Sequence, residues 1–372
     1  MRTDRLRVGR LAIITVFLLM LVLPSLQMTF GFMGVPALQE NRERAPAPHW
    51  AGLLHPADFT TKLQRWFQDH YGFRDLLIRL QTQIEYSVFG SSDRLHIGRD
   101  GWLFYRSVID REEPAIEAMT DTDLDQIVAS FAHLRDWLAA RQIRLVVVTN
   151  QMKDRFYPEF LPRTAERARS RHRFDDFRAR LGMLPGITYI DTTGPLLELK
   201  QQRSIFHKTD FHWNDAAAFA IAGKLVDTIA GLDNRPLPFW RNKLTVELHD
   251  YSGGEAQFMP LFNPPREQAL FVRQTWPDGH LTTIANPEPF EYIAQAPPGG
   301  DHLPPTVVLG DSFFDGLVRC GLLDYFESIA RARTFHAPID AVLHAIPPGT
   351  KIVILQFVEV TLPAFRTLPL PE

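Results

Sequence analysis

Three short apolar runs, rich in β-branched residues, constrain the fold of this chain more than any other feature. They lie at residues 143–149, 305–309 and 351–358. Runs of this length, bounded by turn-forming residues, predict strands that are buried on both faces of a sheet. Helical patterns separate them along the chain, and strands that alternate with helices form a mainly parallel sheet covered on both sides. We therefore predict an α/β fold with a mainly parallel sheet flanked by helices.

The spacing of apolar residues also locates the helices. Residues 59–89 contain two amphipathic patterns that are interrupted at Tyr71 and Gly72. Further helices are predicted at 124–138, 164–181, 195–199 and 216–229. Asn214 is a suitable N-cap for the last of these. A short strand is predicted at 187–190, and the dipeptide Asp100-Gly101 predicts a turn between two strand-like pieces.

Residues 233–304 lack a clear pattern. They are rich in proline, show broken strands at 244–248 and 270–275, and carry little helical signal. We interpret them as a possible insertion, or a lid, within the globular domain.

Composition excludes some classes of function. The 372 residues are 45% hydrophobic, which is ample for a core, and the formal net charge of −3 gives no electrostatic basis for nucleic-acid binding. The single cysteine, Cys320, excludes an intramolecular disulfide and a cysteine-based metal site.

The N-terminus predicts export. Four arginines precede an apolar run at residues 11–23, and no charged residue follows until Glu40. This asymmetry predicts a cytoplasmic N-terminus and an exported remainder. The dense apolar part is short enough for a signal peptide, but no clear small-x-small cleavage site follows it. We predict an uncleaved signal anchor at 1–36, a linker at 37–58 and the globular domain at 59–372.

Two stretches about a hundred residues apart contain the candidate catalytic residues. Gly310-Asp311-Ser312-Phe313 follows the strand at 305–309, so Ser312 is expected at the carboxyl end of that strand, where open α/β sheets bind ligands. In the other stretch, Asp210 and His212 lie two residues apart and point to the same side of an extended segment. His212 could act as the base for Ser312, and Asp210 could orient the imidazole. We predict that these two stretches meet in one site.

A serine nucleophile also needs donors for an oxyanion. The backbone N–H of Ser312 or Phe313, at a helix start, is one candidate, and a second donor could come from the loop at 150–153. The candidates for the oxyanion or for substrate binding are Asn150, Lys153, Tyr157 and Trp213.

Each of these residues also has a purely structural interpretation. Gly-Asp-Ser is a common turn tripeptide, and Asp311 fits a turn carboxylate. Asp210 and His212 could be a cap and a packing residue, whereas Lys153 and Tyr157 could lie on the surface. Together with His207, Asp210 and His212 could bind a metal ion. The functional prediction, which includes neither a metal nor a cofactor, depends on the combination.

The combination resembles a known family, the alginate O-acetyltransferase proteins AlgJ and AlgX. The matching residues are Asp210-x-His212-Trp213-Asn214 and Gly310-Asp311-Ser312-Phe313, supported by the segments 69–74 and 98–105 and by Lys153 with Tyr157-Pro158-Glu159. The resemblance covers roughly residues 60–360. It implies a variant of the SGNH-hydrolase fold, with Ser312 as the acetyl-accepting nucleophile, His212 as the base and Asp210 as its orienter.

The resemblance also implies a setting. We expect a single-pass inner-membrane protein whose catalytic domain lies in the periplasm and works with a membrane-bound O-acyltransferase partner. The expected reaction is O-acetylation of an exported polysaccharide. Two alternatives stay open: an acetylesterase with the same Ser-His-Asp triad, and a non-catalytic scaffold of a polysaccharide secretion complex.

Overall fold

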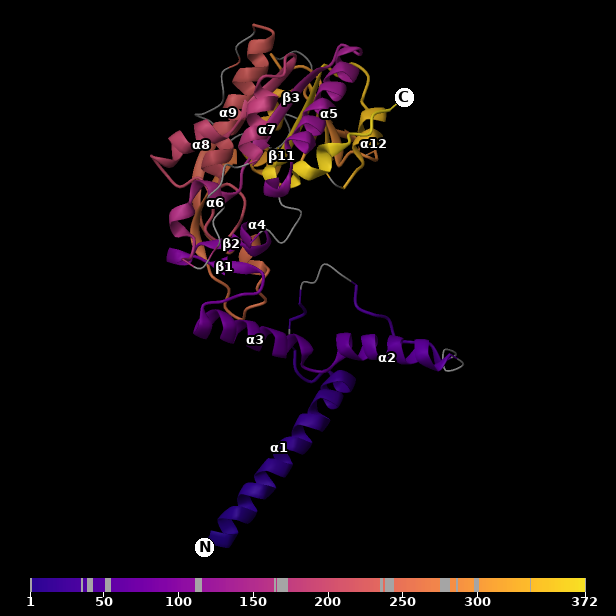
Figure 1. Ribbon diagram of the computed structural model, residues 1–372, viewed down its shortest axis with the longest axis vertical. Helices are drawn as coiled ribbons and strands as arrows, with labels where there is room; N and C mark the ends of the chain where they lie inside the picture. Colours follow the sequence, from indigo (N-terminus) through magenta and orange to yellow (C-terminus); the bar gives the residue numbers. More distant parts are fainter. Residues whose placement is uncertain are drawn as a thin grey trace. The chain divides into compact units, whose positions relative to one another are not determined.

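The main sheet of the computed structural model has seven strands in the order β4-β3-β11-β9-β10-β8-β7 (Figure 1). Its strands are β3 (Arg144–Asn150), β4 (Ile187–Asp191), β7 (Thr282–Ala285), β8 (Tyr292–Gln295), β9 (Thr306–Gly310), β10 (Ser328–Arg333) and β11 (Ile352–Val358). Strands β4, β3, β11, β9 and β10 are mutually parallel, whereas β8 and β7 pair antiparallel at one edge. The predicted mainly parallel sheet is confirmed.

The structure describes residues 2–34, 36–38, 43–50, 55–110, 116–163, 165, 173–234, 237, 244–274, 282–285, 287–297, 301–334 and 336–371. Parts of the predicted linker (39–42 and 51–54), most of the first half of the predicted helix at 164–181, and parts of the possible insertion lie outside the described residues.

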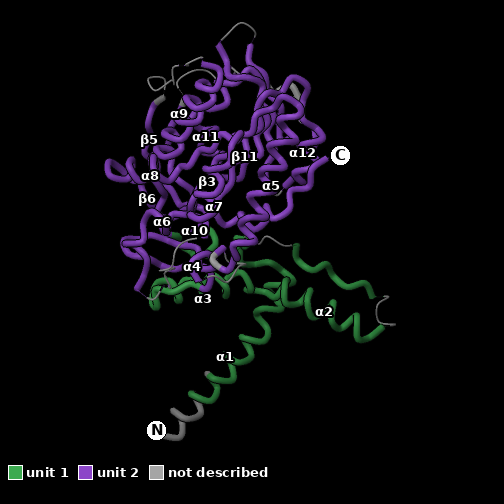
Figure 2. Tube along the Cα trace, turned by 45° about the horizontal axis from the view of Figure 1, so that its top comes forward, with its two compact units in different colours: residues 1–92, 257–264 green, residues 93–256, 265–372 purple. Residues whose placement is uncertain are grey.

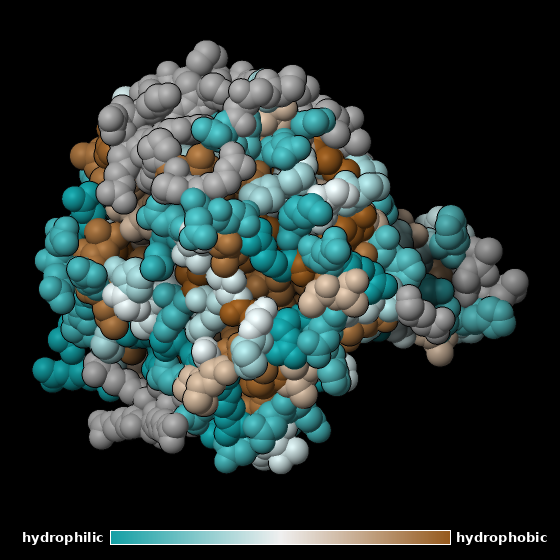
Figure 3. Space-filling view, turned by 90° about the horizontal axis from the view of Figure 1, so that it is seen from above, coloured by the Kyte–Doolittle hydropathy of each residue, from teal (hydrophilic) through white to brown (hydrophobic). Residues whose placement is uncertain are grey.

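Helices cover both faces of this sheet because β3, β9 and β11 are apolar on both sides. One face packs on α5 (Asp121–Ala139), α7 (Arg173–Gly182) and α12 (Ile339–His344). The other packs on α8 (Thr193–Lys200), α9 (Asp215–Leu232) and α11 (Phe314–Arg319). Figure 1 shows α8 and α9 on one side of β3 and β11, with α5 and α12 on the other. On the face drawn in Figure 3, polar residues predominate, with apolar ones between them.

The remaining elements are short. The other helices of this part of the chain are α4 (Arg106–Asp110), α6 (Lys153–Phe156) and α10 (Gly254–Gln257). Two hairpins pair β1 (Leu95–Ile97) with β2 (Leu103–Tyr105) and β5 (Leu244–Tyr251) with β6 (Glu267–Gln274). Turns of 3-10 helix lie at Arg99–Gly101, Ile116–Ala118, Pro158–Phe160, Leu322–Tyr325 and Glu359–Arg366.

Local sequence signals account for the helix starts. Thr120 caps α5 in a capping box, in which its hydroxyl accepts from the Asp123 N–H and its own N–H donates to the Asp123 carboxylate. Asn214 caps α9 as predicted, because its side-chain oxygen accepts from the Ala217 N–H at 3.1 Å.

Strand β10 was missed by the sequence analysis because of its arginines. Ser328–Arg333 carries Arg331 and Arg333, which are uncommon in a buried strand. Arg331 is buried and forms ion pairs with Asp315 of α11 and with Glu291, while Arg333 pairs with the same two carboxylates. The paired carboxylates make burial of these charges possible.

Residues 233–304 contribute to two different parts of the fold. The broken strands predicted at 244–248 and 270–275 belong to the hairpin β5–β6, whose strands are longer than predicted. Strands β7 and β8 extend the main sheet. Of the described strands of this segment, β7 and β8 therefore belong to the main sheet, whereas β5 and β6 form a two-stranded sheet of their own.

The chain divides into two compact units (Figure 2). One comprises Met1–Ser92 with Gln257–Pro264, and the other Asp93–Ala256 with Pro265–Glu372. The first unit contains α1 (Arg2–Phe30), α2 (Pro56–His70) and α3 (Arg74–Phe89), the last two separated at Tyr71 and Gly72 as predicted. Within α1, residues Gly9–Phe30 form a helix long and apolar enough to cross a membrane. A signal sequence meets the same criteria of length and composition.

A test of the core concerns Phe131 of α5. Its ring is fully buried and lies 5.6–5.9 Å from the rings of Phe177, Phe357 and Phe365. Phe131→Ala is expected to destabilise the protein by about 3–5 kcal/mol, because it leaves a cavity between the sheet and α5. The midpoint of thermal unfolding measures this loss, and Leu197→Ala, at a side chain that is 46% exposed, is the control. Equal shifts in the two variants would contradict the packing described here.

Candidate active site

Ser312 lies directly beyond the carboxyl end of β9. The strand is buried along its whole length and ends at Gly310, after which Asp311, Ser312 and Phe313 form a turn that leads into α11. Ser312 is half-buried, and its hydroxyl is at the edge of the sheet where ligands bind in open α/β folds.

The buried side chain of Asp311 holds this turn against β11. Its carboxylate accepts hydrogen bonds from the Gln356 amide (2.8 Å) and from the N–H groups of Val358 (2.7 Å) and Phe313 (2.8 Å). Burial raises the pKa of Asp311, and these three bonds oppose the effect. Asp311 is thus a turn carboxylate, and the Phe313 N–H, a candidate oxyanion donor, is already engaged. Within the described part of the chain the Ser312 N–H has no partner.

The predicted meeting of the two stretches is present in the structure. His212 Nε2 lies 2.7 Å from Ser312 Oγ, and His212 Nδ1 lies 2.7 Å from Asp210 Oδ1. Asp210 Oδ1 also accepts from the His212 N–H at 3.0 Å, which fixes the two residues to each other. The His212 side chain is 25% exposed, whereas that of Asp210 is 7% exposed. The arrangement is a continuous hydrogen-bonded relay from a buried carboxylate to a reachable hydroxyl.

Asp210 is held as a carboxylate by donors on every side. Its Oδ2 accepts from the Tyr251 hydroxyl at 2.6 Å and from the Gly254 N–H at 2.8 Å. Burial alone would raise the pKa of Asp210. The hydrogen bond and electrostatic attraction of His212, with the bonds from Gly254 and Tyr251, outweigh burial and hold the pKa well below its usual range.

Lys153 supports the segment that carries Asp210 and His212. Its side chain is almost fully buried, and its ammonium group donates to the carbonyl oxygens of Asp210 (2.9 Å), Lys208 (3.1 Å) and His207 (3.4 Å). It also forms an ion pair with Glu255. Burial raises the pKa of Glu255, and the neighbouring ammonium group opposes this rise. Lys153 therefore acts on the backbone of the site and not on a substrate.

Glu267 of β6 supports the same segment from the other side. Its carboxylate accepts from the N–H groups of Lys208 (3.0 Å) and Thr209 (2.8 Å) and from the Thr209 hydroxyl (2.7 Å). The Gly253 N–H in turn donates to that hydroxyl at 3.0 Å. Tyr251, Glu255 and Glu267 all come from residues 233–304, and none of them is predicted as a site residue because no local pattern marks that segment.

The other predicted residues lie in buried supporting positions. Trp213 is buried, and its indole N–H donates to the Phe313 carbonyl at 3.0 Å, which joins the histidine segment to the serine turn. The Tyr157 hydroxyl accepts from the Ile205 N–H at 3.0 Å, and its ring packs on Trp102 at 4.3 Å. Neither side chain is placed to contact a substrate directly.

Asn150 ends β3 at the same edge of the sheet. It is fully buried, and neither polar atom of its side chain has a hydrogen-bond partner among the described residues. A buried amide with unused donors is compatible with the predicted oxyanion role, but the amide is not exposed to a substrate in this structure.

The alternative of a metal site does not fit the geometry. Both ring nitrogens of His212 are used, by Asp210 and by Ser312. The ring of His207 packs against Tyr251 at 4.8 Å and Phe271 at 5.8 Å, and burial lowers its pKa. Among the described residues, no group of three histidine, cysteine, aspartate or glutamate side chains is placed to hold a metal ion.

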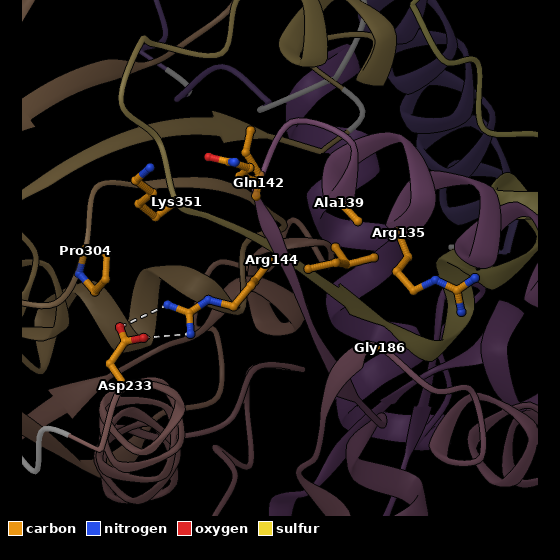
Figure 4. A pocket seen from close by; sticks show the side chains of 10 residues that line it. Arg135, Ala139, Gln142, Arg144, Gly186, Asp233, Pro304 and Lys351 are labelled. Atoms are coloured by element: carbon orange, nitrogen blue, oxygen red, sulfur yellow. Dashed lines mark hydrogen bonds and ion pairs between the residues drawn. The ribbon is translucent and has the colours of Figure 1, made fainter.

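A cavity of ≈ 510 Å³ lies at the opposite edge of the sheet (Figure 4). Its lining includes Arg144 and Lys351, which lie where β3 and β11 begin. Arg144 forms a bidentate ion pair with Asp233, with nitrogen–oxygen distances of 2.9 and 3.0 Å. None of its lining residues belongs to the relay, so the cavity is not part of this site.

Comparisons with known proteins identify similar sequences and folds. Residues 95–269 match the family model ALGX, described as the SGNH hydrolase-like domain of acetyltransferase AlgX. Two curated relatives are named probable alginate O-acetylase AlgJ. The one from Azotobacter vinelandii is 29% identical over 217 residues, 56% of this chain and 54% of that protein. The one from Pseudomonas aeruginosa is 30% identical over 225 residues, 58% and 56% respectively.

Residues 95–269 are therefore similar to the SGNH hydrolase-like domain of AlgX, and the chain is similar in sequence to AlgJ. The resemblance and the fold predicted from the sequence are confirmed. The chain spans about half the length of the curated relatives it matches. The part of this chain that the family model matches includes Asp210 and His212 and ends before Ser312.

Solved structures show the same fold. The O-acetyltransferase domain of Pseudomonas putida AlgJ aligns with a TM-score of 0.52 at 19% identity, over 72% of this chain and 92% of that one. Bacillus cereus PatB1 aligns with a TM-score of 0.54 at 15% identity, over 73% and 98%.

One prediction uses the close approach of Gly253 to the relay. A Cβ at Gly253 would overlap Asp210 Cβ and lie 2.7 Å from the Thr209 carbonyl oxygen. Gly253→Ala is therefore expected to displace Asp210 and to slow acylation of Ser312 by p-nitrophenyl acetate roughly 100-fold. Gly254→Ala is the matched control, because its Cβ would lie 3.5 Å from Asp210 Oδ2, an ordinary contact. Similar rates for both variants would refute the role given to this contact.

A second prediction concerns acid stability. Because the pKa of Asp210 is lower in the folded protein than its ordinary value of about 3.9, its ionised form stabilises the fold above that pH. This contribution is lost as the pH falls from about 4 toward the folded pKa. The difference in thermal midpoint between the unaltered protein and Asp210→Asn is expected to stay constant between about pH 5 and 7 and to shrink below about pH 4. A difference that does not change with pH would show that Asp210 is not held ionised.

Proposed function

We propose that this protein is an O-acetyltransferase that transfers acetyl groups to hydroxyls of an exported polysaccharide through an acetyl-serine intermediate. The observation that carries the proposal is the relay Asp210–His212–Ser312, in which both links measure 2.7 Å. This is the nucleophile–base–orienter arrangement that acyl transfer requires. Similarity to the AlgX family model and the names of the curated relatives support the choice of acetyl as the acyl group.

In the first half-reaction, Ser312 Oγ attacks the carbonyl carbon of an acetyl donor. The hydroxyl proton moves to His212 Nε2, while the proton on Nδ1 stays hydrogen-bonded to Asp210, which stabilises the imidazolium. When the tetrahedral intermediate collapses, the bond to the donor's leaving group breaks, and that group takes the proton from His212. The acetyl group is then esterified to Ser312.

In the second half-reaction, a sugar hydroxyl attacks the acetyl-serine ester. His212 Nε2 takes the proton of that hydroxyl, the new ester bond forms, and the bond to Ser312 Oγ breaks. Ser312 regains its proton from His212. The Ser312 N–H is the first donor for the oxyanion in both steps, because the neighbouring Phe313 N–H is bound to Asp311. Asn150 is the candidate for a second donor.

The setting belongs to the same proposal. The curated relatives are named alginate O-acetylases, which supports a polysaccharide as the acceptor. Helix α1 supports an inner-membrane anchor with the catalytic domain in the periplasm. An acetyl donor used outside the cytoplasm must be delivered across the membrane, and a membrane-bound O-acyltransferase partner fits that requirement.

The deciding experiment incubates the full-length chain, in detergent micelles, with p-nitrophenyl acetate. Peptide mass spectrometry is expected to find one acetyl group, on Ser312, and to find none in Ser312→Ala or His212→Ala. Addition of a candidate glycan is then expected to move the acetyl group from Ser312 to a glycan hydroxyl.

Other outcomes select other functions. Release of acetate without transfer to any glycan would identify an acetylesterase, in which water replaces the sugar hydroxyl. Absence of an adduct in the folded protein, with glycan affinity retained in Ser312→Ala, would identify a scaffold with an inactive site.

A further inference from the structure

Helix α3 carries an apolar stripe that the described chain does not cover. Leu77, Leu80, Ile84 and Val88 are 50%, 47%, 44% and 69% exposed. Their spacings of three, four and four residues place them on one face of the helix. No residue of α3 is buried. Single exposed apolar residues are ordinary on a protein surface, but a contiguous stripe of them marks an interaction site.

The opposite face of α3 is the one that its own unit uses. Arg79 donates to the carbonyl oxygens of Pro36, Ala37 and Leu261, each at 3.3 Å. The side chain of Gln83 accepts from the Phe262 N–H at 3.1 Å. These polar contacts fix the rotation of α3 about its axis, so that the apolar stripe faces outward.

Helix α2 repeats the pattern. Leu63 and Phe67, four residues apart, are 39% and 46% exposed, while the aspartate, lysine and arginine residues of this helix lie on its other sides. Trp66 stacks on His70 at 5.5 Å near the end of the helix. Aromatic residues in such positions are typical of the boundary between membrane and water.

The turn between the two helices contacts α1 within its apolar segment. A Cβ at Gly72 would overlap the carbonyl oxygen of Pro24 and lie 2.8 Å from its carbonyl carbon, so the two backbones touch. Phe73 packs edge-on against Phe32, with ring centroids 6.1 Å apart. Pro24 lies inside Gly9–Phe30, the segment able to cross a membrane. The α2–α3 turn is therefore at the level where that segment ends.

We propose that α2 and α3 lie in the surface of the bilayer that α1 enters, with their apolar faces among the lipid headgroups and upper acyl chains. The inference depends on the proposal that α1 remains as an anchor. Interfacial helices bind membranes through a buried apolar face and through attraction of basic residues to anionic lipids. Because α3 contains two arginines, one aspartate and one glutamate, its net charge is zero. The apolar face thus supplies the binding, and zwitterionic lipids are sufficient.

The test places an environment-sensitive fluorophore at single sites of α3. The full-length variants Leu80→Cys, Ile84→Cys and Thr82→Cys are each labelled and reconstituted in phosphatidylcholine nanodiscs. The native Cys320 is buried and therefore does not compete for the label. Part of the lipid carries a nitroxide near the carboxyl end of its acyl chain. Thr82 is the matched control because it lies two residues from each of the others, about 200° around the helix. Labels at 80 and 84 are expected to be blue-shifted and quenched by the nitroxide, and the label at 82 is not.

Three results would overturn the proposal. Labels at 80 and 84 that only an aqueous quencher reaches would show a solvated stripe. Labels shielded from both quenchers would show that protein covers the stripe, and cross-linking between position 80 of two chains would identify a second copy as that protein. Equal lipid quenching at 82 and 84 would show no preferred face. Circular dichroism confirms that each variant is folded. The readout does not involve Ser312, so acetylation of Ser312 in the same sample reports on the proposed function separately.

Discussion

The site depends on one buried ammonium group. Lys153, the first residue of α6, donates to the carbonyl oxygens of His207, Lys208 and Asp210. Its positive charge is balanced by the carboxylate of Glu255. A buried charge is tolerated only where partners replace its lost hydration, and backbone carbonyls with a carboxylate do so here. Segment 207–210 contains no regular secondary structure of its own. The bonds from Lys153 therefore hold its backbone in place of the backbone hydrogen bonds that a helix or strand would provide. The carboxylate of Asp210 is positioned as a result.

The serine half of the site is ordered differently. Its turn follows a strand at the centre of a parallel sheet, and Asp311 binds it to the neighbouring strand through Gln356 and Val358. Trp213 then connects the two halves through its bond to the Phe313 carbonyl. Rigid elements thus define the position of Ser312, whereas a network of polar side chains defines the position of His212. Preorganisation of this kind is what electrostatic catalysis requires.

Local patterns predicted which three residues form the hydrogen-bonded relay. Ser312 was expected beyond a β-branched run, and Asp210 and His212 were expected to cooperate from their spacing of two residues, because both features are short-range in sequence. The supporting residues were beyond such reasoning. Lys153 was predicted as a site residue but in contact with substrate, since a lysine in a loop gives no sign that its ammonium group will be buried. Tyr251, Glu255 and Glu267 act through contacts across 41 to 102 residues of chain, and no local signal marks such pairs.

The same logic explains the elements. Strands β3, β9 and β11 are apolar on both faces and could be recognised from composition alone. Strand β10 could not, because its arginines become compatible with burial only through Asp315 and Glu291, which lie elsewhere in the chain.

The hairpin β5–β6 supports the relay from outside the main sheet. It contributes Glu267 and Tyr251 to the segment that holds His212, although it provides no reacting atom. A change that loosens this hairpin would therefore disturb the position of His212 while leaving the main sheet and the relay residues themselves unaltered.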